Sequence, residues 1–210
     1  HGAKIVRTAE SQGKTPEDLV DENSEKFRSM QKILNISFDD FVRTSDQKRH
    51  WPGPQKLWQE LVSKGDIYWK KYRGLYCVGC EASITEKDLV DGNCTIHLKP
   101  PVSFKEENHF FKYSEYLPQI KEQIEKDIVK VIPESRKNEM LGLIESGENR
   151  DVSFSRPTES LSWGVPVPDD PTQAMYVWCD ALSNYITALD YEHEGELFTK
   201  FWPAQVHLIG

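Results

Sequence analysis

The residues best suited to chemistry are three cysteines and one histidine, in two pairs of equal spacing: Cys77 and Cys80, then Cys94 and His97. A Cys-x-x-Cys turn supplies two thiolate ligands from one tight bend, and Zn²⁺ prefers four sulfur or nitrogen ligands in a tetrahedron. The thirteen residues between the pairs end in Asp91-Gly92-Asn93, a turn signal that brings the pairs together. The spacing therefore predicts a structural zinc knuckle over residues 77–97.

Other interpretations of these cysteines stay open. The chain could be a thiol redox protein, which needs a free Cys77–Cys80 pair at a helix N-terminus. The Cys77–Cys80 pair could also be merely buried, and in either case Cys94 and His97 would lie nearby by accident. It could also be a zinc-ribbon module that binds nucleic acid or protein without catalysis. The second ligand pair favours zinc over redox chemistry. The net charge of −8, from 26 basic and 34 acidic residues, argues against whole-surface affinity for nucleic acid.

Composition restricts the class of protein further. The 210 residues suffice for one or two domains, and 38% hydrophobic with 11% aromatic residues excludes a disordered chain. No apolar run approaches the roughly 20 residues of a transmembrane helix, so no membrane partner is expected. Outside the knuckle only Cys179 remains, which implies no disulfide framework and favours a reducing compartment, cytoplasmic or organellar. The chain begins without methionine and stops in mid-pattern, so we expect a piece of a longer protein.

Two helices are expected before the knuckle. Thr15 and Pro16 form a helix start, and the apolar residues that follow at helical spacing predict one buried stripe: Val20, Phe27, Met30 and Leu34. A second helix is expected from about Pro54 to Gly65, with four residues facing inward: Leu57, Trp58, Leu61 and Val62. Residues 67–76 and 102–111 are rich in aromatic and β-prone residues and predict two strands that flank the knuckle.

The second half of the chain is expected to return to helices and then to extended segments. A third helical stripe comprises Leu117, Ile120, Ile124 and Ile128, and a fourth helix starts at Pro133 and stops near Gly147. Four prolines between residues 157 and 171 favour extended chain. Residues 176–178 predict a buried strand, and residues 181–189 a short helix. Asp180 could orient a polar group or cap this helix, and the cap is favoured.

Longer blocks along nearly the whole chain, in order, carry a family pattern: His1-Gly2, residues 38–44 (FDDFVRT), 65–68 (GDIY), the knuckle, 133–139 (PESRKNE), 163–168 (WGVPVP), 176–185 (YVWCDALSNY) and 207–210 (HLIG). In these blocks the chain resembles class I methionyl-tRNA synthetases. The blocks at 163–168 and 176–185 are the most specific. The latter disfavours relatives specific for valine, isoleucine, leucine or cysteine.

The resemblance implies an α/β fold, in which a partial Rossmann-type catalytic domain is interrupted by a zinc-knuckle connective-peptide insertion. Residues 1–66 would be a mainly helical catalytic segment, and residues 67–160 the connective peptide. Residues 161–210 would return to the catalytic domain with the methionine-pocket block. Residues 51–54 (WPGP) depart from the basic helix usual in the family, which predicts a delayed or kinked second helix.

The resemblance also implies an activity, namely ATP-dependent activation of methionine, with Mg²⁺, and its transfer to tRNA(Met). The His-x-Gly-His and Lys-Met-Ser-Lys-Ser signatures of the family are not in this sequence, so the chain alone is expected to be inactive. No general acid or base stands out. The class works mainly by positioning and by electrostatic stabilisation of phosphates, and no catalytic residue is assigned.

The site residues follow from the same resemblance. Trp178 and Tyr185 match the aromatic residues of the methionine side-chain pocket, which Ala181 and Leu182 would shape; the alternative for Trp178 is ordinary core packing. Four residues match stretches that meet ATP: His1, Gly2, Ile209 and Gly210. Arg156 matches a position near the tRNA end or the active-site mouth, with a solvated arginine as the alternative. Three further histidines lack partner spacing and are expected to be surface or satisfied core residues: His50, His109 and His193.

Overall fold

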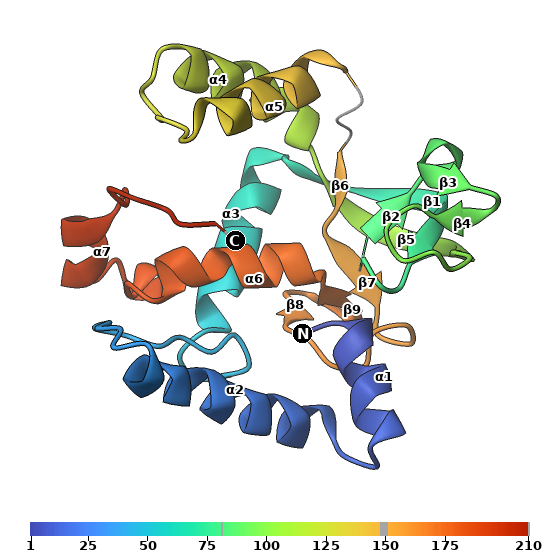
Figure 1. Cartoon of the computed structure of the whole chain (residues 1–210), viewed down its shortest axis with the longest axis horizontal. Coiled ribbons are helices and arrows are strands. Elements are labelled where there is room, and N and C mark those ends of the chain that lie inside the picture. Colours follow the sequence, from blue (N-terminus) through green and yellow to red (C-terminus); the bar gives the residue numbers. More distant parts are fainter. Residues whose placement is uncertain (81, 148–150, 210) are drawn as a thin grey trace.

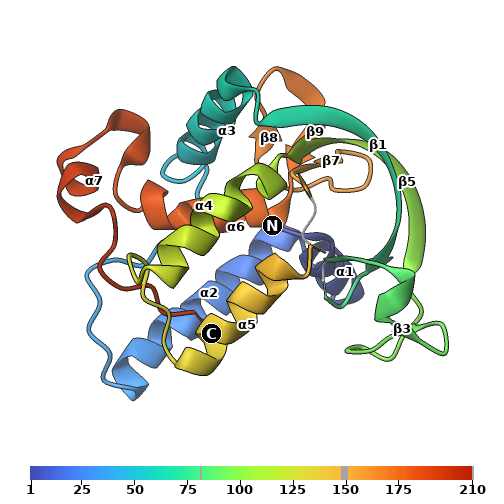
Figure 2. The ribbon, with the colours of Figure 1, turned by 90° about the horizontal axis from the view of Figure 1, so that it is seen from above.

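A long antiparallel strand pair, β1 (Ile67–Cys77) and β5 (Val102–Phe111), extends from a body of helices and short strands (Figures 1 and 2). The computed structural model describes residues 1–80, 82–147 and 151–209. The register runs unbroken from Ile67 opposite Phe111 to Tyr76 opposite Val102. Both predicted strands are confirmed. Because the two strands are paired along their length, the knuckle between them lies at the end of the hairpin that is far from the body.

The sheet that contains this hairpin has the strand order β2-β1-β5-β6, with β2 at Ala82–Ile84 and β6 at Val152–Ser153. The connection between β1 and β5 holds a short 3₁₀ helix and a two-stranded hairpin: η1 (Glu86–Asp88), β3 (Leu89–Val90) and β4 (Asn93–Cys94). Every strand pair in the described part of the chain is antiparallel. The predicted mixture of helices and sheet is confirmed.

The N-terminal part is helical: α1 (Ala3–Ser11), α2 (Pro16–Ile33) and α3 (Pro52–Lys64). The Thr15 hydroxyl accepts a hydrogen bond from the backbone N–H of Asp18 (3.1 Å), which confirms the predicted N-cap. Helix α3 ends at Gly65 with φ 76°, as expected. The predicted delay of α3 is wrong, because the helix already begins at Pro52. Proline is tolerated at the first helical position, where its missing N–H would have no intrahelical partner.

The predicted buried stripe of α2 is also wrong. Phe27, Met30 and Leu34 are exposed, and Leu19 is the buried residue of this helix. Val62 of α3 is likewise exposed, although Trp58 is buried as predicted. Helical periodicity identifies an apolar face, but it does not predict whether another element of the fold covers that face.

A helical hairpin, α4 (Tyr113–Glu125) and α5 (Glu134–Glu145), follows the long strand pair. Leu117 and Ile124 are buried, but Ile128 lies beyond the end of α4 and is exposed, so the predicted stripe stops one turn early. None of the helices in the described part of the chain is both long and apolar enough to cross a membrane.

The last part forms a three-stranded sheet and three helical segments. The strand order is β7-β9-β8, with β7 at Ser155–Pro157, β8 at Pro166–Val167 and β9 at Asp170–Met175. After it come α6 (Val177–Thr187), η2 (Tyr191–His193) and α7 (Glu196–Phe201). The core of this part is a buried apolar cluster: Trp58, Val165, Val167, Met175 and Cys179.

The predicted strand at residues 176–178 is wrong. Strand β9 ends at Met175, Tyr176 is the N-cap of α6, and Trp178 lies in the first turn of the helix. A short apolar run fits a buried strand and a helix equally well, and here the tertiary context decides for the helix.

Candidate functional site

The β3–β4 hairpin brings the two ligand pairs of the knuckle together. Its two-residue turn has positive φ at both Asp91 (51°) and Gly92 (77°), as Asp-Gly turns of this type require. The thiols of Cys77, Cys80 and Cys94 and the His97 ring then lie with their ligand atoms within 4.8 Å of one another. The predicted ligand set is therefore assembled in the fold.

The distances within the cluster fit a tetrahedral metal ion. Cys80 Sγ lies 3.7 Å from Cys94 Sγ, and Cys77 Sγ lies 3.8 Å from His97 Nδ1. Zn–S bonds of about 2.3 Å in a tetrahedron place sulfurs about 3.8 Å apart. The distance from Cys80 Sγ to His97 Nδ1 is shorter, 3.0 Å. A cluster of three cysteines and one histidine with this geometry could hold Zn²⁺.

The thiols of the cluster differ in acidity. Backbone N–H groups of His97 and Ile96 donate to the Cys94 sulfur and lower its pKa to about 6. Burial raises the pKa of Cys80 to about 12, and the neighbouring thiols Cys77 and Cys94 add to this shift. Gathered thiolates repel one another, whereas a divalent cation stabilises all of them at once. The electrostatics of the cluster therefore suit a bound cation.

Glycine is required at position 79. A Cβ atom there would lie 2.4 Å from Cδ2 of the His97 ring. The ring thus packs directly on the Gly79 backbone, which orients Nδ1 toward the sulfurs. Cys77 is the last residue of strand β1 and Cys80 lies in the turn before strand β2, so the helix N-terminus that a redox pair needs is not at this place.

Helix α6 presents large apolar side chains outward and small or polar ones inward. Trp178, Leu182 and Tyr185 are 47%, 57% and 42% exposed, at a spacing that puts them on one face with Ala181. The buried residues of the helix are Cys179, Asp180, Ser183 and Thr187. Within the described part of the chain, Trp178 is therefore not packed in the core. The four residues predicted for the methionine pocket share an open helix face.

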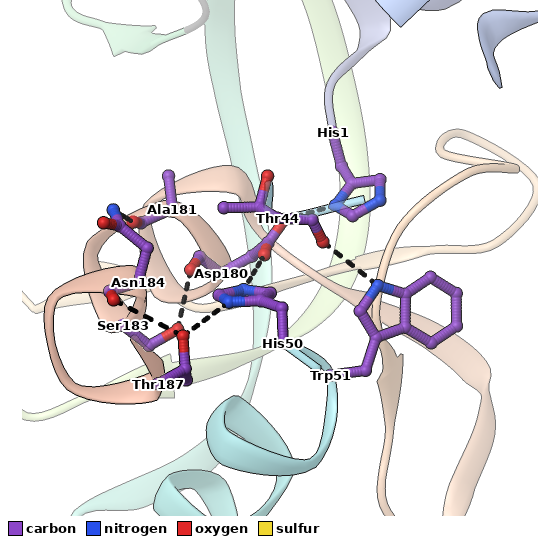
Figure 3. Close-up of polar contacts among 9 residues, drawn as sticks. All are labelled: His1, Thr44, His50, Trp51, Asp180, Ala181, Ser183, Asn184 and Thr187. Atoms are coloured by element: carbon purple, nitrogen blue, oxygen red, sulfur yellow. Dashed lines mark hydrogen bonds and ion pairs between the residues drawn. The ribbon is translucent and has the colours of Figure 1, made fainter. Parts of the chain in front are cut away.

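The sequence predicts that Asp180 caps a helix, and this prediction is wrong. Asp180 is instead the fully buried centre of a hydrogen-bond network (Figure 3). Its Oδ1 accepts from His50 Nε2 (2.8 Å), and its Oδ2 accepts from His1 Nδ1. The other ring nitrogen of His50 lies 2.8 Å from the Thr187 hydroxyl. His50 is thus a satisfied core residue, as predicted. The hydrogen bonds of the two histidines join residues 130 to 179 positions apart in sequence, so no spacing pattern signals the network.

The imidazole of His1 is fully buried and lies edge-on to Trp51 and Trp163, with ring centroids 5.8 and 4.5 Å away. Its second nitrogen, Nε2, is buried without a hydrogen-bond partner in the part of the chain that the structure describes. Asp180 therefore provides the hydrogen bond that orients this ring.

A cavity of about 290 Å³ lies between the long strand pair and the C-terminal sheet and helix. It is lined by residues from both sides, among them Gly2, Tyr76, Glu106, Tyr176 and Val177. Arg156 also lines it and is only 7% exposed, so the solvated alternative for this arginine is wrong. Its guanidinium donates to Ser155 O (2.9 Å) and lies 4.1 Å from the centre of the Tyr176 ring.

The four residues predicted to meet ATP have different surroundings. Gly2 lines the cavity and His1 is held by Asp180, whereas Ile209 is exposed and Gly210 lies outside the described residues. The two other histidines agree with the prediction. His109 Nε2 lies 3.0 Å from Asp170 Oδ2, and His193 is a surface residue beside Asp190.

The profile described as tRNA synthetases class I (M) matches residues 1–94 and 77–210, and the chain belongs to this family. Because the match extends over the whole chain, a free-standing zinc-ribbon module is disfavoured.

Individual relatives agree with this family. The chain is 46% identical over 211 residues to a methionine--tRNA ligase of Clostridium perfringens, covering 100% of this chain and 32% of that protein. It is 43% identical over 219 residues to one of Streptomyces coelicolor, of which it covers 40%. Mycobacterium tuberculosis methionyl-tRNA synthetase bound by methionyl-adenylate (Met-AMP) matches with a TM-score of 0.89 at 37% identity, over 97% of this chain and 41% of that one. The chain thus spans between a third and two fifths of the length of these relatives.

Proposed function

We propose that this chain is the part of a methionine--tRNA ligase that recognises the methionine side chain and carries a zinc-stabilised insertion. The open apolar face of α6 carries this proposal, since a surface of Trp178, Leu182 and Tyr185 on a helix with a polar buried face suits an apolar ligand. In this proposal residues 1–66 and 161–210 belong to the catalytic domain, and residues 67–160 form the connective peptide. The complete ligase would activate methionine with ATP and Mg²⁺ and transfer it to tRNA(Met).

The methionine pocket would use Trp178 as its wall, Tyr185 as its edge, and Ala181 and Leu182 between them. A thioether is polarizable and gains about 0.3–1.5 kcal/mol from contact with an aromatic ring. Burial of the methylene groups adds about 0.8 kcal/mol for each. The small side chain of Ala181 would leave room for the ligand between the two aromatic rings.

His1, Gly2, Ile209 and Gly210 would contribute to the ATP site. Glycine supports this role at position 2, because it lets the backbone come close to a ligand in the cavity that it lines. Arg156, whose guanidinium already pairs with Glu106 (3.8 Å), would stand near the tRNA end or at the mouth of the site, where it would hold that side of the cavity in place. These groups would bind and orient the reactants without transferring protons.

The cluster of Cys77, Cys80, Cys94 and His97 would bind one structural zinc ion. All four positions of a tetrahedron are filled by protein atoms, so no open position remains for a water or a substrate. The ion would fix the end of the long strand pair, whose connecting segment buries few apolar side chains.

The pocket is tested by Trp178→Ala in the full-length ligase, with methionine-dependent ATP–pyrophosphate exchange as the assay. We expect the KM for methionine to rise at least about tenfold, which corresponds to ~1.4 kcal/mol. The KM for ATP should change less than about twofold. Trp69→Ala is the matched control, since Trp69 is a tryptophan of similar exposure (46%) on strand β1. Equal losses for both substrates, or an equal effect of the control, would contradict the proposal.

A further inference from the structure

The orientation of α6 has an unusual physical basis. In most surface helices the apolar stripe is buried and fixes the rotation of the helix about its axis. In α6 three large residues face outward: Trp178, Leu182 and Tyr185. Val177 and Ile186 are only half-buried, and Cys179 is the one apolar side chain among the buried residues of the helix. Hydrophobic burial therefore constrains the rotation of this helix weakly.

Asp180 and the ligand face lie on opposite sides of the same helix. With about 100° of rotation per residue, Asp180 is turned about 200° from Trp178. Any rotation of α6 that moves the carboxylate also moves Trp178 and Tyr185. A constraint on Asp180 is therefore a constraint on the proposed methionine pocket.

The carboxylate is constrained from two sides (Figure 3). His1 Nδ1 and His50 Nε2 each bond a different oxygen of Asp180, so the side chain cannot rotate without breaking a hydrogen bond. The Thr187 hydroxyl lies 2.8 Å from His50 Nδ1 but 3.4 Å from the Asn184 carbonyl oxygen. The shorter contact favours donation from the hydroxyl to Nδ1, so that Nε2 donates to Asp180.

His50 therefore bonds α6 at two positions, Asp180 in its first turn and Thr187 at its end. Two attachments on one face, seven residues apart, fix both the rotation and the tilt of the helix. The pair His50 and Asp180 is fully buried, so water does not compete for these bonds.

We infer that Asp180, held by His1 and His50, is a positioning residue that sets the rotation of α6 and thereby the discrimination of the methionine pocket. This inference rests on the proposed function. Its consequence is specific. A change in rotation alters how the aromatic rings meet the thioether sulfur, and so alters the preference for methionine over norleucine, which has a methylene group in place of the sulfur.

The test compares kcat/KM for methionine and for norleucine in ATP–pyrophosphate exchange by the full-length ligase. Asp180→Asn should reduce the methionine-to-norleucine ratio several-fold, up to about tenfold, since an amide N–H₂ would face one of the two imidazole donors. Asp190→Asn is the matched control, because Asp190 also pairs with a histidine but lies at the surface. The control should leave the ratio unchanged.

A second pair of variants separates the hydrogen bond from the shape of the side chain. His50→Leu removes the donor to Asp180 and should reduce the ratio, whereas His50→Gln keeps an amide donor and should restore most of it. If Asp180→Asn gives no folded protein, this pair carries the test. Unchanged ratios in folded Asp180→Asn or His50→Leu protein would overturn the inference but leave the proposed function intact. An unmodified ligase without methionine-dependent exchange would instead overturn the proposed function.

Discussion

The two sites of this molecule are organised over very different distances in sequence. The knuckle is built from residues 77–97, and its ligands meet because one hairpin with an Asp91-Gly92 turn folds back locally. The network behind α6 joins His1, His50 and Asp180, which meet only once the tertiary structure has formed. A local site of this kind would need only a single ion to hold it together. The α6 site, in contrast, requires that distant parts of the chain have already folded against one another.

The forces that hold the two regions differ accordingly. Among its described residues the knuckle buries Cys77 and Cys94 and almost no other apolar side chain, so in the proposed function its stability would come from a bound metal. The body has an apolar core around Trp58 and Met175, on which α6 rests through Cys179. We therefore expect that either region can unfold while the other stays folded, and the following predictions test this independence.

The largest expected effect is the loss of zinc in Cys94→Ser. The protein purified without chelator should contain about one zinc per chain and the variant almost none, because structural zinc sites bind with roughly 10–16 kcal/mol. Elemental analysis measures this. Cys179→Ser, a change at the one cysteine outside the cluster, should keep its zinc. A metal-free parent protein would show that the knuckle is not a zinc site.

Trp58→Ala should produce the largest loss of stability in the body. Trp58 is 2% exposed and packs on Val165, Met175 and other core residues, and truncation of such a side chain costs about 3–5 kcal/mol. Urea denaturation measures the loss, and the zinc content of the folded variant should stay at its original value. A cost below about 1 kcal/mol would mean that this cluster is not the core that supports α6.

Gly79→Ala should weaken the knuckle without removing a ligand. The added methyl group would overlap the His97 ring, and relief of such an overlap costs about 1–3 kcal/mol, which is about a 5- to 150-fold loss of zinc affinity. Competition with a chelator gives the affinity. The matched control is Gly142→Ala on α5, where the new Cβ atom meets no neighbour within 4 Å. Equal affinities of the two variants would show that the close contact of Gly79 and His97 is not required.

The smallest effect is expected at the exposed counterpart of the buried His50–Asp180 pair. The hydrogen bond from His193 to Asp190 raises the pKa of His193 above its ordinary value of 6.5. A raised pKa in the folded state means that the stabilisation is complete below the unfolded pKa and is lost as the pH rises through the folded pKa. In Asp190→Asn, an NMR titration should show the His193 pKa closer to 6.5. An unchanged pKa would mean that the pair does not form in solution.

Local features of the fold could be predicted from the sequence. The strands at residues 67–77 and 102–111, the Thr15 cap and the Gly65 helix end all depend on neighbouring residues, and so does the ligand set of the knuckle. Such signals lie within a few residues of the structure that they specify.

Features that depend on distant partners could not be predicted. Residues 177 and 178 are helical because the buried face of α6 packs on the core. The apolar stripe of α2 is exposed because helical periodicity in the sequence does not tell whether another element covers that face. Asp180 followed a predicted strand and therefore suggested a helix cap. Its two histidine partners lie 130 and 179 residues away in sequence, and only the tertiary structure brings them to it.

The independence of the two regions is tested most directly by hydrogen exchange of the full-length protein before and after removal of the metal by a chelator. We predict that backbone protection is lost in residues 77–99, while α6 and strands β7 to β9 keep their protection. Loss of protection in α6 to the same extent and at the same chelator concentration would contradict it.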